Sequence, residues 1–534
     1  MANNSSQTVI IGGGLAGLAA AVELAATGQR VTLIEKNAHL GGKMNVLSDR
    51  GYSFDMGPTI ITMPQVLRGI IDRAKAPGTR VEDYIDLRPC DPQWRCMYED
   101  GTRIDLCGNV RQMAERLGKQ FGPEVGAGYE KFLTFSRRMY KLSERVFFYR
   151  DVGSALDLMK QSPMNDFGLL KDVLAMRAHS TMAATAHKNI AEPHVRQMVE
   201  HAMQYVGSNP FWAPAILSLI ASAQADHGVW YPMGGTRMVS RALERLAVER
   251  EVTLIRSAKV ARINSAEGVV TGVTLDDGRE IGAAHVVSNC DVQRTNRDLI
   301  AGGPGRREQQ AIAARYTPAC SGVVLYLGLD RQYEHLAHHN FLFSSSSDRE
   351  FGDIYTRGVP TSDPTLYLAA PSRTDPTQAP AGGEALYVLV HTPFIRAGQQ
   401  WGGEEKAEKL MAEYKPVIMA KLKRFGMPDI EQHVVVDRFL HPGMIDQWYN
   451  AEGGAIYGLA SHGKLRGGFK PKNRSNVLKG LYLCGGSANP GPGVPMVLMS
   501  GVTAARAVMQ DAGVPMASMA QIIEAKPDAV LATR

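Results

Sequence analysis

The pattern of apolar and polar residues is clearest at the start of the chain. Residues 9–11 form a short apolar run, and a stretch of small apolar residues at helical spacing follows from 15 to about 27. Gly28 marks the end of that stretch, and residues 30–35 form a second apolar run that closes on an acid. This pattern predicts a strand, a glycine-rich turn, a helix and a second strand.

The rest of the chain alternates between helical and extended patterns. Helices are predicted over 64–75, 237–249, 403–425 and 493–510, and residues 109 to about 225 are helical in period and rich in methionine. Strands are predicted over 51–55, 95–98, 102–106, 252–255, 269–275, 285–288, 320–329, 365–369, 384–391 and 480–486, with 252–255 and 269–275 expected to form a hairpin-like pair. Strands that alternate with helices around a glycine-rich turn indicate an α/β fold (α+β over the whole chain) with a parallel, Rossmann-like sheet.

The first turn carries a dinucleotide-binding fingerprint in its full context. Gly12, Gly14 and Gly17 follow a strand and open a helix, and Glu35 ends the next strand. Gly12 allows the tight turn, Gly14 lets a pyrophosphate approach the backbone, and Gly17 lets helix and strand pack closely. The free N–H groups of the helix N-terminus suit phosphates, and Glu35 suits the ribose hydroxyls while it repels a 2′-phosphate. The segment therefore predicts a dinucleotide site that excludes NADP.

A second glycine pair favours FAD over NAD. Gly41, Gly42 and Lys43 come shortly after the second strand. This turn looks like the flavoprotein extension in which a second loop and its cation reach the ribityl-phosphate side of FAD.

Composition narrows the class of protein. The 534 residues are 44% hydrophobic and 21% charged, with a net charge of +6 spread along the chain, so we expect two to four domain-sized units and no nucleic-acid partner. The six cysteines form no C-x-x-C pair, which indicates reduced thiols. The N-terminus lacks the features of a signal peptide. The charge-free run 211–225 is shorter than the roughly 20 residues that cross a bilayer, so no transmembrane helix is expected.

Several motifs in order resemble one family, the bacterial phytoene desaturases and related FAD-dependent carotenoid oxidoreductases and oxygenases. The resemblance runs from about residue 8 to 510, and its motifs are Gly228 to Thr236, Ser288 to Asp291, the histidine string 335–339, Tyr367 to Pro380 and Leu481 to Pro495. The chain departs from the family at 488–491, where a histidine is missing. Residues 455–463 look more like members that act late in the pathway, such as 3,4-desaturases of hydroxylated carotenoids and terminal oxygenases of C30 carotenoids.

The resemblance implies non-covalent FAD and a set of residues around it. Backbone N–H groups near Val494, Met496 and Val497 would face the pyrimidine edge of the flavin, and Val260 would lie on the adenine. The residues expected to bind FAD are Gly12, Gly14, Leu15, Ala16, Gly17, Glu35, Lys36, Gly42, Lys43, Gly57, Pro58, Thr59, Val260, Asn289, Gly485, Gly486, Val494, Pro495, Met496 and Val497.

The resemblance also implies three domains. The FAD-binding domain is expected at 1–75, 228–300 and 475–534, a β-rich substrate domain at 76–110 and 301–474, and a helical membrane-binding or lid subdomain at 111–227.

The sequence offers fewer candidate catalytic residues than candidate FAD-binding residues. Asp157 and Lys160 match an Asp-x-x-Arg pair that the family places in the substrate channel, and i and i+3 share a helix face. A solvated surface pair is the alternative reading. His462 is a candidate for contact with the substrate end. His335, His338 and His339 lack a Cys or carboxylate in register, so we expect a packing role and no metal site. Cys484 lies in an apolar strand and is expected to be a core thiol, not a covalent flavin anchor.

A basic, aromatic segment at 131–176 favours attachment to an anionic membrane surface, with a solvated helix over the core as the alternative. A long hydrocarbon has negligible aqueous concentration, because each CH₂ left in water costs about 0.8 kcal/mol. We therefore expect a peripheral protein on the cytoplasmic side of a membrane.

These observations predict a desaturase that introduces C=C bonds into an acyclic carotenoid or a C30 analogue and passes electrons to a quinone or to O2. The alternatives on the same scaffold are a carotenoid oxygenase or ketolase and an isomerase or saturase. Amine oxidase is a weaker flavin alternative. A prenyl-binding escort protein is the non-enzyme alternative, and the intact FAD motifs argue against it.

Overall fold

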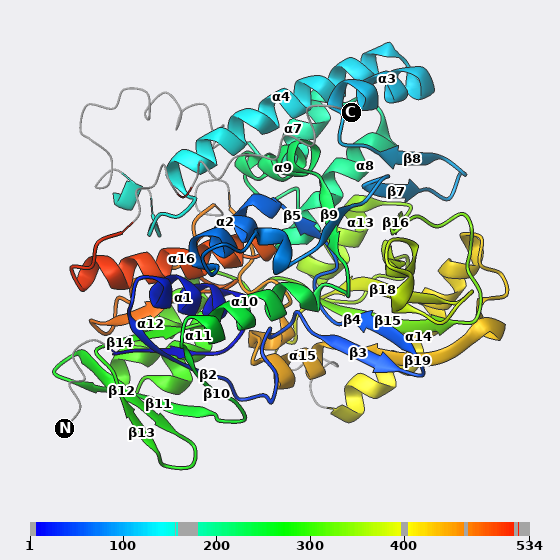
Figure 1. Cartoon of the computed structure of the whole chain (residues 1–534). Helices are drawn as coiled ribbons and strands as arrows, with labels where there is room; N and C mark the ends of the chain where they lie inside the picture. The colour runs from blue at the N-terminus through cyan, green and yellow to red at the C-terminus, as the bar shows by residue number, and fades with distance from the viewer. Residues whose placement is uncertain are drawn as a thin grey trace.

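The computed structural model describes residues 7–154, 156–158, 180–396, 404–463, 468–516 and 522. Figure 1 shows a parallel sheet with its helices at one end of the molecule, a larger sheet at the other, and a helical layer across both.

The first sheet is assembled from three separated parts of the chain. Its strands are parallel and follow the order β10 (Thr253–Ile255), β2 (Arg30–Ile34), β1 (Gln7–Ile11), β14 (His285–Ser288) and β20 (Leu481–Leu483). Because β14 pairs in parallel with both β1 and β20, the carboxyl ends of these two strands, more than 400 residues apart in the sequence, lie at the same edge of the sheet with β14 between them. The fold class expected from the pattern is confirmed.

One predicted pairing is wrong. The strand predicted at 252–255 does not pair with 269–275; as β10 it extends the parallel sheet beside β2. Its place is taken by β11 (Val260–Ala266), which pairs with β12 (Val269–Leu275), and β12 pairs in turn with β13 (Glu280–Gly282). Leu254 and Ile255 of β10 are half-buried there and pack against two different apolar clusters.

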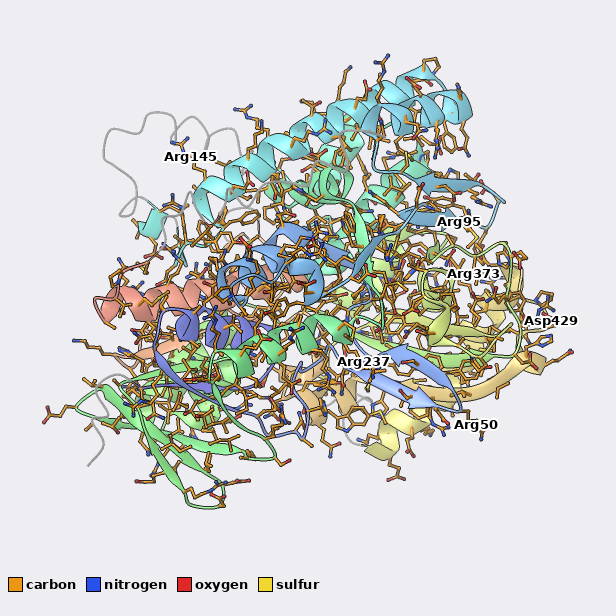
Figure 2. The ribbon with its side chains drawn as sticks, viewed as in Figure 1. Arg50, Arg95, Arg145, Arg237, Arg373 and Asp429 are labelled. Atoms are coloured by element: carbon orange, nitrogen blue, oxygen red, sulfur yellow. The ribbon has the colours of Figure 1, made fainter. Side chains whose placement is uncertain are left out.

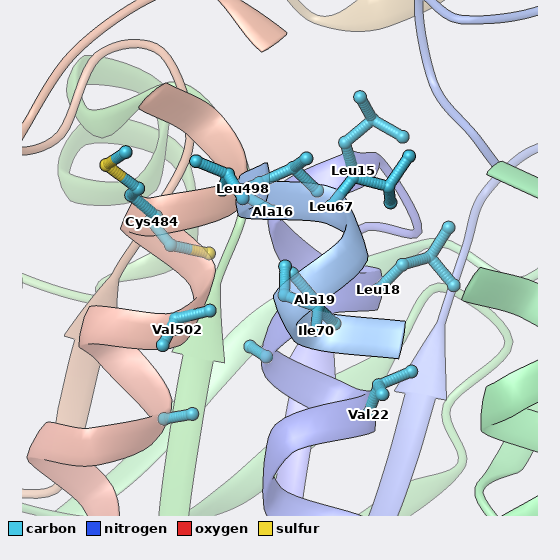
Figure 3. Packing of buried hydrophobic residues seen from close by; sticks show 14 of the residues in the cluster. Leu15, Ala16, Leu18, Ala19, Val22, Leu67, Ile70, Cys484, Leu498 and Val502 are labelled. Carbon is cyan, nitrogen blue, oxygen red and sulfur yellow. The ribbon is translucent and has the colours of Figure 1, made fainter. Parts of the chain in front are cut away.

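Close helix packing holds the nucleotide-binding end together. Helix α1 (Leu15–Ala26) lies against α16 (Val494–Asp511), α2 (Pro64–Ala74) and α10 (Arg237–Glu249). A Cβ at Gly501 of α16 would lie only 2.2 Å from the carbonyl oxygen of Ala16, so glycine lets the two helices touch. Figure 3 shows Ala16 and Ala19 of α1 facing Leu498 and Val502 of α16 in this core.

The second sheet is mostly antiparallel. Its order is β19 (Val434–Leu440), β15 (Ser321–Leu329), β18 (Glu384–Thr392), β17 (Leu366–Ala369), β16 (His339–Leu342), β7 (Trp94–Met97) and β8 (Arg103–Leu106). Successive side chains point to opposite faces. Val323 and Leu325 pack with α14 (Glu404–Arg424), whereas Val324 and Tyr326 belong to the apolar cluster on the opposite face.

The helical layer contains α3 (Val110–Phe121), α4 (Pro123–Val146), α7 (Met182–Asn189), α8 (Pro193–His201) and α9 (Leu219–His227). Of the basic, aromatic segment 131–176, residues 131–146 belong to α4, and residues 155 and 159–176 lie outside the described part of the chain. Phe132, Phe147 and Phe148 are buried in the cores, which leaves the outer face of α4 charged, not aromatic. Figure 2 shows charged side chains along this face, including Arg145.

The remaining strands are β3 (Val46–Asp49), β4 (Tyr52–Asp55), β5 (Ile61–Thr62), β6 (Leu87–Pro89) and β9 (Val229–Pro232). The remaining helices are α11 (Val292–Arg294), α12 (Gly303–Arg315), α13 (Ser347–Phe351) and α15 (Pro442–Tyr449). Short 3-10 or π turns cover Val81–Asp83, Ala202–Val206, Ala215–Ser218, Thr295–Leu299, Gly352–Arg357, Pro371–Arg373, Pro376–Gln378, Ile430–His433 and Glu452–Gly454. Within the described ranges, every helix is too short or too polar to cross a bilayer.

Candidate active site

A cavity of about 620 Å³ begins at the carboxyl ends of β1, β2 and β14 and reaches the second sheet. One end is lined by the glycine turns of the parallel sheet, and the other by aromatic and aliphatic side chains. The two ends therefore differ in chemistry within one continuous space.

The N-terminus of α1 faces the first end. Gly14 is its N-cap and offers no side-chain cap, so the N–H groups of the first turn have no partner from that residue. A Cβ at Gly14 would lie 2.8 Å from Nδ2 of Asn289, and one at Gly17 would lie 2.1 Å from the carbonyl oxygen of Gly12. The glycines keep this turn tight and its amides accessible, which suits a pyrophosphate.

Glu35 lies beside this turn at the end of β2. Its carboxylate accepts hydrogen bonds from the backbone N–H of Gly13 at 2.7 Å and of Asn37 at 2.9 Å, and it is buried at the cavity wall. These bonds hold a charged acceptor in place, with lone pairs left for hydroxyl donors. Val260 lines the neighbouring wall.

A second uncapped helix N-terminus reaches the same cavity. Helix α16 begins at Val494 after Gly493, which also provides no side-chain cap. Gly485 follows β20, and a Cβ there would lie 2.7 Å from Oδ1 of Asn289. The Asn289 amide thus lies between the N-terminal and C-terminal glycine turns, and it donates to the carbonyl oxygen of Gly12 at 3.2 Å.

Most residues expected to bind FAD come together here. The cavity is lined by Gly12, Gly14, Leu15, Ala16, Glu35, Lys36, Gly42, Lys43, Gly57, Pro58, Thr59, Val260, Asn289, Gly485, Gly486, Val494, Pro495, Met496 and Val497. Gly17 does not line it and instead permits close packing. Two helix N-termini without side-chain caps, glycine turns that leave their backbone amides accessible, and a carboxylate in a fixed position fit a flavin dinucleotide.

The two lysines are held by backbone and amide oxygens. Lys43 donates to the carbonyl oxygens of Ala455 at 3.2 Å and Ile456 at 2.7 Å, and burial lowers its pKa to about 8. Lys36 donates to Asn450 Oδ1 at 3.1 Å, and burial lowers its pKa as well. Both side chains therefore reach the cavity from fixed positions.

The far end of the cavity was not predicted from the sequence. Its lining includes Val324, Phe341, Tyr367, Tyr387 and Leu389 on one face of the second sheet. Residues 321–329 and 384–392 are mostly apolar throughout and are buried on both faces. The sequence pattern therefore predicts buried strands, but it does not say which face encloses a cavity.

Polar groups at this end are neutral. His201 and His391 are buried, and burial lowers the pKa of each to about 3. His391 Nε2 lies 3.3 Å from the hydroxyl of Tyr457, which also lines the cavity. The end wall thus combines apolar area with a few uncharged hydrogen-bonding groups.

Two of the three predicted catalytic residues, Asp157 and His462, lie outside the cavity wall. Asp157 accepts from the N–H of Gly153 at 3.0 Å and from the hydroxyl of Ser154 at 2.8 Å, and it is not part of the cavity wall. His462 accepts from the N–H of Asn209 at 2.9 Å, and burial lowers its pKa to about 3, but it too is outside the wall. Lys160 lies outside the described residues. Catalytic roles for Asp157 and His462 stay predictions without geometric support.

Cys484 is fully buried between β20 and α16, and burial raises the pKa of its thiol. Figure 3 shows it within the same apolar core as Leu498 and Val502, and it also contributes to the cavity lining.

The family model for flavin-containing amine oxidoreductases matches residues 15–509. This chain belongs to that family. The protein is therefore an FAD-dependent oxidoreductase, as the motifs predicted, and its cofactor is FAD.

Two relatives whose activities are known by name are similar to this chain over most of its length. The chain is 35% identical to a 4,4'-diapolycopene oxygenase from a Methylomonas species, over 93% of this chain and 97% of that protein. It is 34% identical to a 4,4'-diaponeurosporene oxygenase from Staphylococcus haemolyticus, over 93% of this chain and 96% of that protein. The resemblance to carotenoid oxidoreductases is thereby confirmed.

Solved structures share the fold. An oxidoreductase from Methanosarcina mazei aligns with a TM-score of 0.60 at 19% identity, over 94% of this chain and 100% of that one. Putrescine oxidase bound to putrescine aligns with a TM-score of 0.60 at 14% identity, over 95% and 99%.

Proposed function

We propose that this flavoenzyme oxygenates a long acyclic carotenoid of the C30 type near one end of its chain. The observation that carries the proposal is the single cavity that joins the flavin-binding turns to an apolar, mostly aromatic end. The two relatives described above, which are named as oxygenases, favour oxygenation over the other reactions of this scaffold.

The apolar end would bind and orient the polyene. Transfer of a hydrocarbon from lipid to an apolar cavity is nearly neutral in free energy, so shape and position decide which carbon meets the cofactor. Phe341, Tyr367 and Leu389 provide that surface from one face of the second sheet.

The neutral polar groups would serve the oxygenated product. His391 and Tyr457 remain uncharged near pH 7. A neutral group holds water less tightly than a charged one, so an apolar chain can lie against it at lower cost. Once an oxygen is attached to the polyene, His391 and Tyr457 offer hydrogen bonds to it.

Bound FAD supplies a two-electron acceptor and, when reduced, a site for reaction with O2. The uncapped N-terminus of α16 would stabilise negative charge on that group, because its first-turn N–H groups carry partial positive charge.

Desaturation is the second candidate, and it is the first interpretation from the sequence. The same cavity and cofactor suit removal of two hydrogens from a carbon–carbon bond, since a cation next to a polyene is stabilised by resonance. For a desaturase, the electron acceptor would be a quinone or O2.

Product analysis tests the proposal. The holoenzyme would be supplied with a C30 polyene in lipid vesicles under ¹⁸O₂, and products analysed by mass and absorption spectra. Incorporation of labelled oxygen is the expected result. Loss of hydrogen with a red shift and no label would instead identify a desaturase, and an unchanged mass with an altered spectrum an isomerase. A purified protein that neither contains nor takes up FAD would contradict the flavoenzyme and favour the escort alternative.

A further inference from the structure

Three buried side chains from separated segments meet behind the cavity wall. Cys90 follows β6, His339 is the first residue of β16, and His338 immediately precedes it. Sγ of Cys90 and one ring nitrogen from each histidine lie within 4.8 Å of one another, and all three residues are buried. The histidine string alone did not predict this cluster, because the cysteine comes from about 250 residues earlier.

Each histidine has one ring nitrogen engaged and one left over. Nδ1 of His338 lies 2.6 Å from the hydroxyl of Thr374, and Nδ1 of His339 lies 2.8 Å from the hydroxyl of Tyr367. Nε2 of both rings is buried without a hydrogen-bond partner. Metal-binding imidazoles have this arrangement. A contact at one ring nitrogen, here a hydroxyl at Nδ1, fixes the ring and its tautomer, and the other nitrogen, here Nε2, is left for the metal.

We propose that Cys90, His338 and His339 bind a soft monovalent cation, Cu(I). On binding, the thiol loses its proton to solvent and a sulfur–metal bond forms, so thiolate and Cu(I) cancel in charge within a buried site. Thiolate and imidazole are ligands that copper accepts.

Charge argues against a divalent ion. Within the described part of the chain, no carboxylate joins the cluster. The nearby Asp55 instead accepts from the hydroxyl of Tyr231 at 3.0 Å and from the N–H of Thr236 at 2.7 Å. Zn²⁺ would therefore keep a net positive charge in a buried place and lack a fourth protein ligand, whereas structural zinc is almost always four-coordinate.

The distances are compatible with three-coordination. Metal bonds of roughly 2.0 to 2.3 Å to nitrogen and sulfur place the ligand atoms of a trigonal site roughly 3.5 to 4 Å apart. Small side-chain shifts from the observed spacing of at most 4.8 Å suffice.

Anaerobic competition of the FAD-loaded protein against bicinchoninate, a Cu(I) chelator, tests the site. We expect one Cu(I) per chain, and at least a tenfold loss of affinity in Cys90→Ser. The matched control is Cys96→Ser on β7, another buried thiol, which should keep wild-type affinity. Retained flavin absorbance and an unchanged unfolding midpoint show that each variant is folded.

X-ray absorption on the copper-loaded wild type is a second measurement that needs no variant. One sulfur and two nitrogen ligands would support the site. Absence of a sulfur ligand, equal affinity in Cys90→Ser and wild type, or displacement of Cu(I) by stoichiometric Zn²⁺ would overturn the proposal. Because every readout is binding or spectroscopy, a failed oxygenase assay leaves the outcome unaffected.

Discussion

At the scale of single residues, the cofactor end of the cavity is built from side chains that hydrogen bonds and close packing hold in fixed positions. The Glu35 carboxylate is fixed by two backbone N–H groups, and Asn289 is enclosed by two glycine turns. The far end depends instead on side chains that burial keeps neutral, as at His201 and His391.

Replacement of Glu35 by Gln is expected to raise the dissociation constant of FAD about tenfold, or about 1.4 kcal/mol. The amide loses the charge, and its NH₂ would face a backbone N–H of Gly13 or Asn37 that now donates to the carboxylate. Flavin fluorescence titration measures the change. Glu280→Gln, an exposed acid on β13, is the control. Equal affinity in Glu35→Gln and wild type would contradict a ribose-binding role.

A buried lysine predicts a pH effect on stability. Lys470 is fully buried, donates to the carbonyl oxygen of Ala460 and the hydroxyl of Ser461, and burial lowers its pKa from 10.5 to about 7. Between those values the unfolded chain binds more protons than the folded one. The free energy of unfolding therefore rises with pH from about 7 towards 10, by at most about 1.4 kcal/mol per pH unit.

Denaturant unfolding at several pH values in this window checks the effect. Relative to wild type, Lys470→Met should lack this contribution, so the difference between the two proteins should change with pH. Lys479→Met, at an exposed position, should follow wild type. Parallel pH profiles of wild type and Lys470→Met would refute the assignment.

At the scale of elements, two helices from opposite ends of the sequence present uncapped N-termini to one cavity. Helices α1 and α16 can do so because glycine lets them touch at Ala16 and Gly501. The contact therefore links the pyrophosphate end of the site to the flavin-ring end.

Gly501→Ala is expected to destabilise the protein by about 1 to 3 kcal/mol, because the added methyl group would meet the backbone of Ala16. FAD content should fall as the helices separate, measured as the ratio of flavin to protein absorbance together with denaturant unfolding. Gly118→Ala in α3 is the matched helical control, since its Cβ would meet nothing nearer than 3.7 Å. Similar behaviour of the two variants would argue against tight helix contact.

At the scale of the whole molecule, the sequence predicted attachment to a membrane surface through a basic, aromatic segment. The fold changes which side chains of that segment would contact the membrane. Phe132, Phe147 and Phe148 of this segment lie in the cores, so charged side chains dominate the outer face of α4. Attachment should then depend on anionic lipid and on salt, because exposed charges are screened.

Arg138→Glu with Lys141→Glu should lower binding to anionic vesicles at least tenfold, since each basic residue near such a surface contributes about 1 kcal/mol. Vesicle sedimentation at low and high salt measures this. The control is Arg306→Glu with Arg307→Glu on α12, which Figure 1 places far from α4. Equal loss in both double variants would reflect net charge and not a membrane-facing helix.

The sequence by itself determined the nucleotide end of the protein, because that site is made of backbone. The turn at Gly12 and Gly14 needs particular residue types at fixed spacing, so local spacing alone predicts a dinucleotide site. The family motifs extended this prediction to the flavin-ring end at Val494–Val497.

Only the tertiary structure decided the substrate end and the cysteine–histidine cluster. Phe341 lies on β16, whereas Tyr387 and His391 lie on β18. Cys90 meets His338 only because two sheets bring their segments together. Their apolar runs show that these strands are buried, but long-range packing decides which of their residues share one cavity.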